Sequence, residues 1–174
     1  NKKVILLDMR NHGNSFWSRS HTYEEMSDDI LKIISKYNQR VDLIGHSMGG
    51  KAAMYFACKN SNFLKKLVII DIAPIEYQNI WNDLFINLLS YNYNKVKKRG
   101  DLENYLLSKG YNKEFCLFIS QNLIKGKDGN YKLKFNLEAI YKNLKNIMSF
   151  PKDLDCFNGK TLFLRGENSS YLKS

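Results

Sequence analysis

The chain has 174 residues, of which 44% are hydrophobic, 13% aromatic and 25% charged, so it can bury one sizeable core and is too apolar to be disordered. Its net charge of +10 comes from scattered lysines with no arginine-rich stripe, which argues against a nucleic-acid partner. No apolar run reaches the ~20 residues of a membrane span, and no signal peptide is visible. Three widely spaced cysteines (Cys58, Cys116 and Cys156) indicate reduced thiols, so we expect a cytoplasmic protein.

Apolar runs alternate with helical patterns along the first 74 residues. The runs at residues 3–8, 41–45 and 67–71 are short and continuous, which is typical of strands buried on both faces of a sheet. Residues 9–20 form a polar loop, and Thr22 is a candidate N-cap for a helix that extends to about Tyr37. A second helix is expected at residues 48–59. This alternation predicts the α/β class, with a parallel sheet and flanking helices.

The alternation stops after residue 74, and the next 80 residues have mainly helical patterns. We expect helices at residues 77–89, 93–99, 101–108, 113–124 and 137–147, a turn at 126–129 and a small exposed strand at 131–135. A fourth core strand is expected at 160–165. The sequence therefore predicts a core formed by residues 1–74 and 155–174, with a mainly helical cap inserted at residues 75–154.

The most informative motif is Gly45-His-Ser-Met-Gly49, between an expected strand and an expected helix. This is the context required of a nucleophile elbow, in which Ser47 occupies a strained turn that exposes its hydroxyl. We expect Gly45 and Gly49 to be needed because a Cβ atom at either would collide with the turn. The Met48 backbone N–H, at the helix N-terminus, is the expected first oxyanion donor.

Several segments in chain order resemble the α/β-hydrolase superfamily and, within it, the YbfF-type esterases. They are Asp8-Met-Arg-Asn-His-Gly13 with Ser15, Ile44 to Ala52, Ile70-Asp-Ile-Ala-Pro74, and Gly166 with Asn168, Ser169 and Tyr171. The resemblance implies a serine hydrolase with a partial α/β-hydrolase fold and a helical cap.

The resemblance to YbfF-type esterases places the catalytic acid at Asp71, at the end of the third expected strand. That position is also reasonable on physical grounds, because sites on parallel sheets gather at the carboxyl ends of the strands. Glu167 occupies the position after the cap that is more usual in the superfamily, and it is the alternative acid. Asp155 is a third, less favoured candidate acid, because it lies further back in the sequence from the position after the cap.

The catalytic base is not evident. All three histidines, His12, His21 and His46, precede Ser47, whereas the superfamily order is serine, acid, histidine. We expect His21 to be a solvated loop residue and His12 to lie in a site wall or at the surface. The resemblance also implies a second oxyanion donor on a loop that is not found in the chain. We therefore expect truncation at both ends, no triad-dependent turnover by the 174 residues alone, and about 10 Å between the strands at 3–8 and 41–45, since two spacings of ~4.8 Å would separate them.

The sequence thus predicts a cofactor-free and metal-free hydrolase that cleaves a small carboxylic ester or acyl thioester through an acyl-enzyme on Ser47. Apolar cap residues either line an acyl pocket or form only the cap's own core; they are Trp81, Phe85, Leu88, Phe115, Phe118 and Leu123. Two alternatives remain open: a non-catalytic binding module, and a C–C hydrolase or haloperoxidase on the same fold. The acyl chain length, leaving group and oligomeric state are not predicted.

Overall fold

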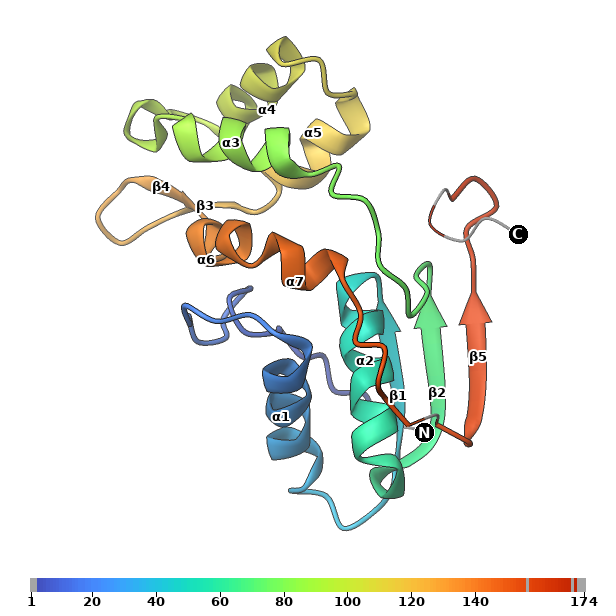
Figure 1. Cartoon of the computed structure of the whole chain (residues 1–174). Helices are drawn as coiled ribbons and strands as arrows, with labels where there is room; N and C mark the ends of the chain where they lie inside the picture. Colours follow the sequence, from blue (N-terminus) through green and yellow to red (C-terminus); the bar gives the residue numbers. More distant parts are fainter. Residues whose placement is uncertain (1–2, 156, 170, 172–174) are drawn as a thin grey trace. The chain divides into compact units, whose positions relative to one another are not determined.

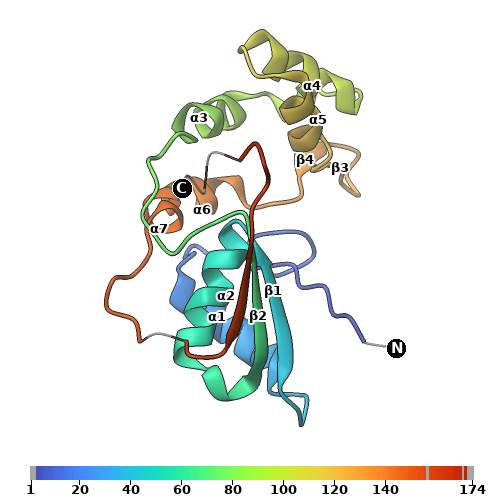
Figure 2. The same ribbon diagram turned by 90° about the vertical axis from the view of Figure 1, so that its right-hand side faces the viewer.

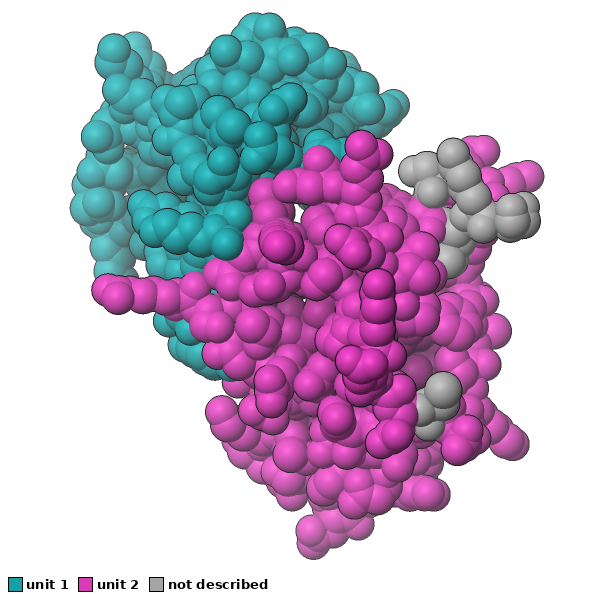
Figure 3. Space-filling view, in the orientation of Figure 1, with its two compact units in different colours: residues 1–18, 80–142 teal, residues 19–79, 143–174 magenta. Residues whose placement is uncertain are grey.

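The computed structural model describes residues 3–155, 157–169 and 171, so Cys156 lies outside the described residues. The chain divides by its internal contacts into two units (Figure 3). Unit 1 comprises residues 1–18 and 80–142, and unit 2 comprises residues 19–79 and 143–174. The expected boundaries of core and cap, at residues 74 and 155, remain a prediction.

Unit 2 contains a parallel three-stranded sheet with helices against it (Figure 1). The strand order is β1-β2-β5, and each pair of neighbours is parallel. These strands confirm the expectations at residues 41–45, 67–71 and 160–165, and α2 occupies the expected residues 48–59. The elements of unit 2 are α1 (Tyr23–Ile34), β1 (Val41–His46), α2 (Met48–Lys59), the 3-10 helix η1 (Ser61–Phe63), β2 (Leu64–Ile70), α7 (Leu144–Met148) and β5 (Lys160–Leu164).

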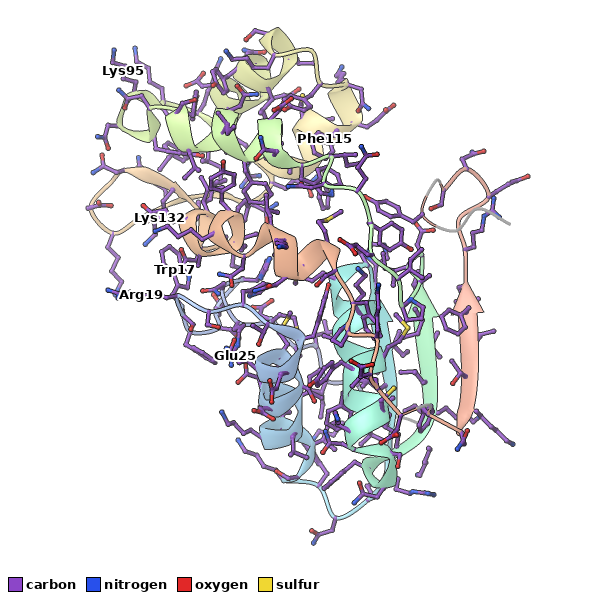
Figure 4. The ribbon with its side chains drawn as sticks, viewed as in Figure 1. Trp17, Arg19, Glu25, Lys95, Phe115 and Lys132 are labelled. Atoms are coloured by element: carbon purple, nitrogen blue, oxygen red, sulfur yellow. The ribbon has the colours of Figure 1, made fainter. Side chains whose placement is uncertain are left out.

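Helix α1 begins at the predicted N-cap, Thr22. The Thr22 hydroxyl accepts a hydrogen bond from the Glu25 N–H at 3.3 Å, and the Glu25 carboxylate accepts one from the Thr22 N–H at 3.2 Å. Glu25 lies in the first turn of the helix (Figure 4). This reciprocal pair satisfies two backbone N–H groups that would otherwise lack acceptors at the helix start. The helix ends at Ile34, slightly before the expected Tyr37.

Only one face of the sheet is covered by helices of unit 2, which corrects the expectation of strands buried on both faces. Helix α2 packs against one face, where Gly45, Leu67 and Ile69 are buried, and α1 packs beside α2 (Figures 1 and 2). On the opposite face, Ile44 pairs in register with Val68, which in turn pairs with Leu162. Ile44 and Leu162 are 64% and 52% exposed. A continuous apolar run predicts a strand, but the run cannot show which faces neighbouring elements cover.

Residues 3–8 form no strand, so the expectation of a first strand there is wrong. They are extended coil with exposed apolar side chains at Val4, Ile5, Leu6 and Leu7. A strand requires a neighbouring strand to satisfy its N–H and C=O groups, and no described strand pairs with this segment. Within the described residues β1 pairs only with β2, so no ladder joins residues 3–8 to β1. The 10 Å separation remains untested.

Unit 1 contains most of the expected helical insertion, with several boundaries corrected. The expected helix at 93–99 is a 3-10 turn at Tyr93–Lys95, and the one at 77–89 begins only at Asn82. The helix at 113–124 ends at Ser120, because Leu123–Lys125 instead pairs antiparallel with Tyr131–Leu133 around the predicted turn. The elements are α3 (Asn82–Ser90), η2 (Tyr93–Lys95), α4 (Arg99–Ser108), α5 (Lys113–Ser120), β3 (Leu123–Lys125), β4 (Tyr131–Leu133) and α6 (Leu137–Lys142).

The helix expected at residues 137–147 is two helices, α6 and α7. Asn143 separates them, with φ −104° and ψ 10°, outside the helical range. No helix among the described residues is long and apolar enough to cross a membrane.

Five of the six apolar cap residues belong to the packing of unit 1. One of them, Phe85, stacks on Tyr141 with 6.1 Å between the ring centres. Leu88 and Leu123 are buried in its hydrophobic core, and Trp81 and Phe115 pack against that core. The rings of Trp81 and Phe115 stack at 5.7 Å, with Phe115 on α5 (Figure 4). Phe118, in contrast, is 63% exposed. The interpretation as the cap's own core therefore describes most of these residues, and Phe118 remains accessible.

Candidate active site

Ser47 lies at the sharp turn between β1 and α2, as expected of a nucleophile elbow. Its backbone has φ 51° and ψ −124°, a conformation that non-glycine residues adopt only under constraint. Two sets of hydrogen bonds provide the constraint. The Ser47 N–H donates to the Ile70 carbonyl at 3.0 Å, and the Ser47 carbonyl accepts from the N–H groups of Gly50 and Lys51 at 2.8 and 3.1 Å. The strand ladder and the first turn of the helix thus meet at this single residue.

The Ser47 hydroxyl is not used to stabilise the helix. Serine at an N-cap ordinarily accepts a hydrogen bond from the second or third helical N–H. Ser47 makes no such bond, and its side chain is half-buried. The strained backbone and the uncommitted hydroxyl together favour a chemical role over a structural one.

The glycines around the turn are not equivalent. A Cβ at Gly45 would lie 2.7 Å from the backbone of Gly49 and Gly50, and a backbone atom cannot move aside as a side chain can. A Cβ at Gly49 would meet nothing within 4 Å, so the expected collision at Gly49 is wrong. Gly50 is the second constrained position, because a Cβ there would lie 2.6 Å from the Ile72 side chain. Within the Gly49-Gly50 pair, it is therefore the second glycine that leaves no room for a Cβ atom.

The Met48 N–H has no hydrogen-bond acceptor among the described residues. It is the first N–H of α2, so no helical carbonyl can pair with it. It follows Ser47 directly, which is the position expected from the sequence for the first oxyanion donor. The Met48 side chain lies against His21, with 3.2 Å between Sδ and the His21 Nε2.

Asp71 follows β2 as Ser47 follows β1. Because His46 and Ile70 pair in the parallel register, Ser47 and Asp71 are the next residues along two adjacent strands. Adjacent strands lie about 4.8 Å apart, so both residues belong to one edge of the sheet. Asp71 also has a left-handed backbone, with φ 56°, and its N–H donates to the Leu164 carbonyl at 2.8 Å.

The Asp71 carboxylate is held toward the end of the neighbouring strand. Its Oδ1 accepts a hydrogen bond from the Gly166 N–H at 3.3 Å. The alternative acid, Glu167, follows Gly166 and is exposed. Of the two candidate acids, Asp71 is half-buried and oriented by a backbone donor.

The histidines occupy three different environments. His21 is fully buried against Met48, so the expectation of a solvated loop residue is wrong. His46 is exposed on β1, and side chains of consecutive strand residues point to opposite faces. His12 lies in unit 1, where its Nδ1 is 3.0 Å from the Arg10 carbonyl oxygen and its ring stacks on Phe135. Burial lowers the pKa of His12, against smaller opposing effects of the Arg10 carbonyl and the Asp8 charge.

Two buried residues near the elbow were missed as candidates by the sequence analysis, His21 and Lys51. Lys51 is 2% exposed, although lysine is rarely buried. The only signal in the sequence was its position directly after Gly49 and Gly50 in the first turn of a helix. The side-chain partners of both residues come from other segments, which a local pattern does not show.

Comparison with known proteins decides the family. Residues 1–98 match the model of the alpha/beta hydrolase fold family. The chain belongs to this family. A putative esterase/lipase of Haemophilus influenzae is 36% identical over 98% of the chain, and the esterase YbfF of Escherichia coli is 30% identical over 97%. A solved structure titled "Marine microorganism esterase" aligns with 96% of the chain at a TM-score of 0.90 and 35% identity, and the alignment covers 67% of that structure's chain.

These matches confirm the resemblance to YbfF-type esterases and the α/β-hydrolase fold. The chain spans 58% of the length of the Haemophilus influenzae relative and 65% of the Escherichia coli one. Family membership and fold therefore rest on both sequence and structure, and the activity is a matter of proposal.

Proposed function

We propose that this α/β-hydrolase is an esterase that cleaves carboxylic esters or acyl thioesters through an acyl-enzyme on Ser47. The observation that carries the proposal is the strained Ser47 backbone, with a hydroxyl that makes no helix-capping hydrogen bond, beside a Met48 N–H that has no acceptor among the described residues. The names of the similar proteins, an esterase/lipase and two esterases, support the same class of substrate.

In the proposed reaction the Ser47 Oγ attacks the acyl carbon while a base takes its proton. The carbonyl oxygen becomes an oxyanion, which the Met48 N–H stabilises as one of its donors. The alcohol or thiol leaves with a proton, and water then hydrolyses the acyl-enzyme to release the acid. Neither step requires a metal or an organic cofactor.

Asp71 is proposed as the acid that orients the base and stabilises its charged form. Its support is the position at the end of β2, one strand from Ser47, and the hydrogen bond from Gly166. Glu167 is the alternative. The base itself would follow the acid in the order of the family, and all three histidines of the 174 residues precede Ser47.

Two other functions use the same fold. A binding module would not need the Ser47 hydroxyl, and a C–C hydrolase or haloperoxidase would use Ser47 on a different bond. The uncommitted hydroxyl argues against the first. The second is disfavoured because relatives that share 36% and 30% of their aligned residues with this chain are named as esterases.

The test is turnover of a short p-nitrophenyl ester and of an acyl-coenzyme A thioester by the native full-length protein. Ser47→Ala should abolish hydrolysis of whichever substrate is cleaved. Ser61→Ala, at an exposed serine just beyond α2, is the matched control and should leave the rate unchanged. Hydrolysis that persists in Ser47→Ala, or an absence of turnover on both substrates, would contradict the proposal.

A further inference from the structure

Lys51 makes an unusual set of contacts within unit 2. Its Nζ donates to the carbonyl oxygens of Met148 and Ser149, both at 2.9 Å, and lies 3.5 Å from that of Ile147. The ammonium is also 4.8 Å from the centre of the Tyr77 ring and 5.9 Å from that of Tyr23, close enough for attraction to both rings. These groups surround a positive charge that solvent scarcely reaches.

The three carbonyls belong to the end of α7, where a helix leaves its last carbonyls without helical donors. Two of them have a second donor. The Tyr77 N–H donates to Met148 at 2.9 Å, and the Tyr23 hydroxyl donates to Ile147 at 2.5 Å. For Ser149, Lys51 is the donor found within the described residues. Lys51 therefore joins α2, α7 and the segment around Tyr77 in one network.

The network lies next to two of the places where the chain passes between the units. The chain leaves unit 2 after Asn79, which is two residues beyond Tyr77. It returns to unit 2 at Asn143, which is four residues before Ile147. Both connecting segments are thus fastened to the same side chain. That side chain stands on the first turn of α2, four residues after Ser47.

Stability alone does not account for a charge at this position. Burial lowers the pKa of Lys51 to about 8, against the opposing effect of Glu76. Burial therefore makes the charged form costly to hold at this position, and a buried apolar side chain of similar volume often serves stability as well or better.

We propose that Lys51 is a positioning residue that fastens both connections of the 80–142 insertion to the helix that carries the nucleophile. The part of the proposal that concerns catalysis rests on the proposed esterase function. There, Lys51 acts on substrate binding through the connecting segments and takes no part in the chemical step.

The test compares Lys51→Met with Lys59→Met in the native full-length protein. Lys59 is exposed in the last turn of the same helix and provides the control. Hydrogen exchange at the Tyr77 and Ser149 amides should become at least about 10-fold faster in Lys51→Met, since the hydrogen bonds donated by Nζ to Met148 and Ser149 are lost, while the Ile69 amide in β2 is unchanged. With the ester, KM should rise and kcat should stay within about twofold. Lys59→Met should change none of these values.

A second measurement needs no variant. If opening of the network hydrates Lys51 and restores its ordinary pKa, raising the pH from 7 to 9 should increase protection of the Tyr77 amide, by up to about 10-fold per unit above pH 8. Tyr23, Tyr77 and Glu76 are the titratable groups that face Lys51; the pKa of Tyr23 is raised well above this range by burial.

Unchanged exchange at Tyr77 and Ser149 would overturn the proposal, and so would equal acceleration at Ile69, which would indicate a general structural role. A fall in kcat at constant KM would overturn the positioning role in catalysis. Exchange does not depend on turnover and can be repeated in Ser47→Ala. Failure of the esterase function would therefore appear as absent turnover with the exchange result intact.

Discussion

The elbow glycines allow a paired test of the turn geometry. In Gly45→Ala, the new Cβ would lie 2.7 Å from backbone atoms of Gly49 and Gly50, at the point where strand and helix are joined. Overpacking of this kind costs about 2 kcal/mol, and more where backbone must move. For a protein of this size that loss lowers Tm by about 4–8 °C.

Gly49→Ala is the matched control four residues away. Its Cβ would enter open space, and Gly49 lies within α2. Replacing a helical glycine with alanine stabilises by about 0.5–1 kcal/mol, so Tm should stay the same or rise. Thermal unfolding followed by circular dichroism, confirmed by urea titration, measures both variants in the native full-length protein. Equal destabilisation by the two substitutions would refute the geometry of the turn described above.

Three further predictions concern the acid, the buried lysine and the first helix. Asp71→Asn should lower kcat for ester hydrolysis by on the order of 10⁴ through loss of orientation of the base, whereas Glu167→Gln should have little effect; the reverse pattern would assign the acid to Glu167. Because the folded pKa of Lys51 is about 8 and thus below its unfolded value, stability due to this group is gained as the pH rises through 8 and is lost as it falls. The free energy of unfolding, measured relative to Lys51→Met, should therefore increase by about 1–2 kcal/mol between pH 7.5 and 9.5, and a decrease would show that the fold favours the charged form. Thr22→Ala should cost about 1 kcal/mol in urea unfolding through loss of the α1 N-cap, and no change would remove the cap from the account.

Local patterns in the sequence predicted those elements whose causes are local. Thr22 is the N-cap of α1 as expected, and residues 48–59 are helical as their pattern indicates. The elbow was also predictable, because a serine between two glycines at a strand–helix junction has few other uses. Asp71 required the resemblance to a family in addition to its place at a strand end.

The errors fall where distant segments decide the outcome. Residues 3–8 have a strand-like composition but pair with no strand in the described part of the chain. Leu123–Lys125 follows a helical pattern in sequence but pairs with Tyr131–Leu133. His21 and Lys51 are polar residues whose burial depends on partners 27 and about 97 positions away. A residue's own neighbours in sequence do not reveal such partners.

The most direct test of the central claim is covalent labelling of Ser47. The native full-length protein would be treated with a fluorophosphonate, which reacts with activated serine hydroxyls, and the modified peptide identified by mass spectrometry. We expect one adduct, on the peptide that contains Ser47, lost in Ser47→Ala and retained in Ser61→Ala. Absence of an adduct on the wild-type protein, or an adduct that persists in Ser47→Ala, would contradict the assignment of Ser47 as the nucleophile.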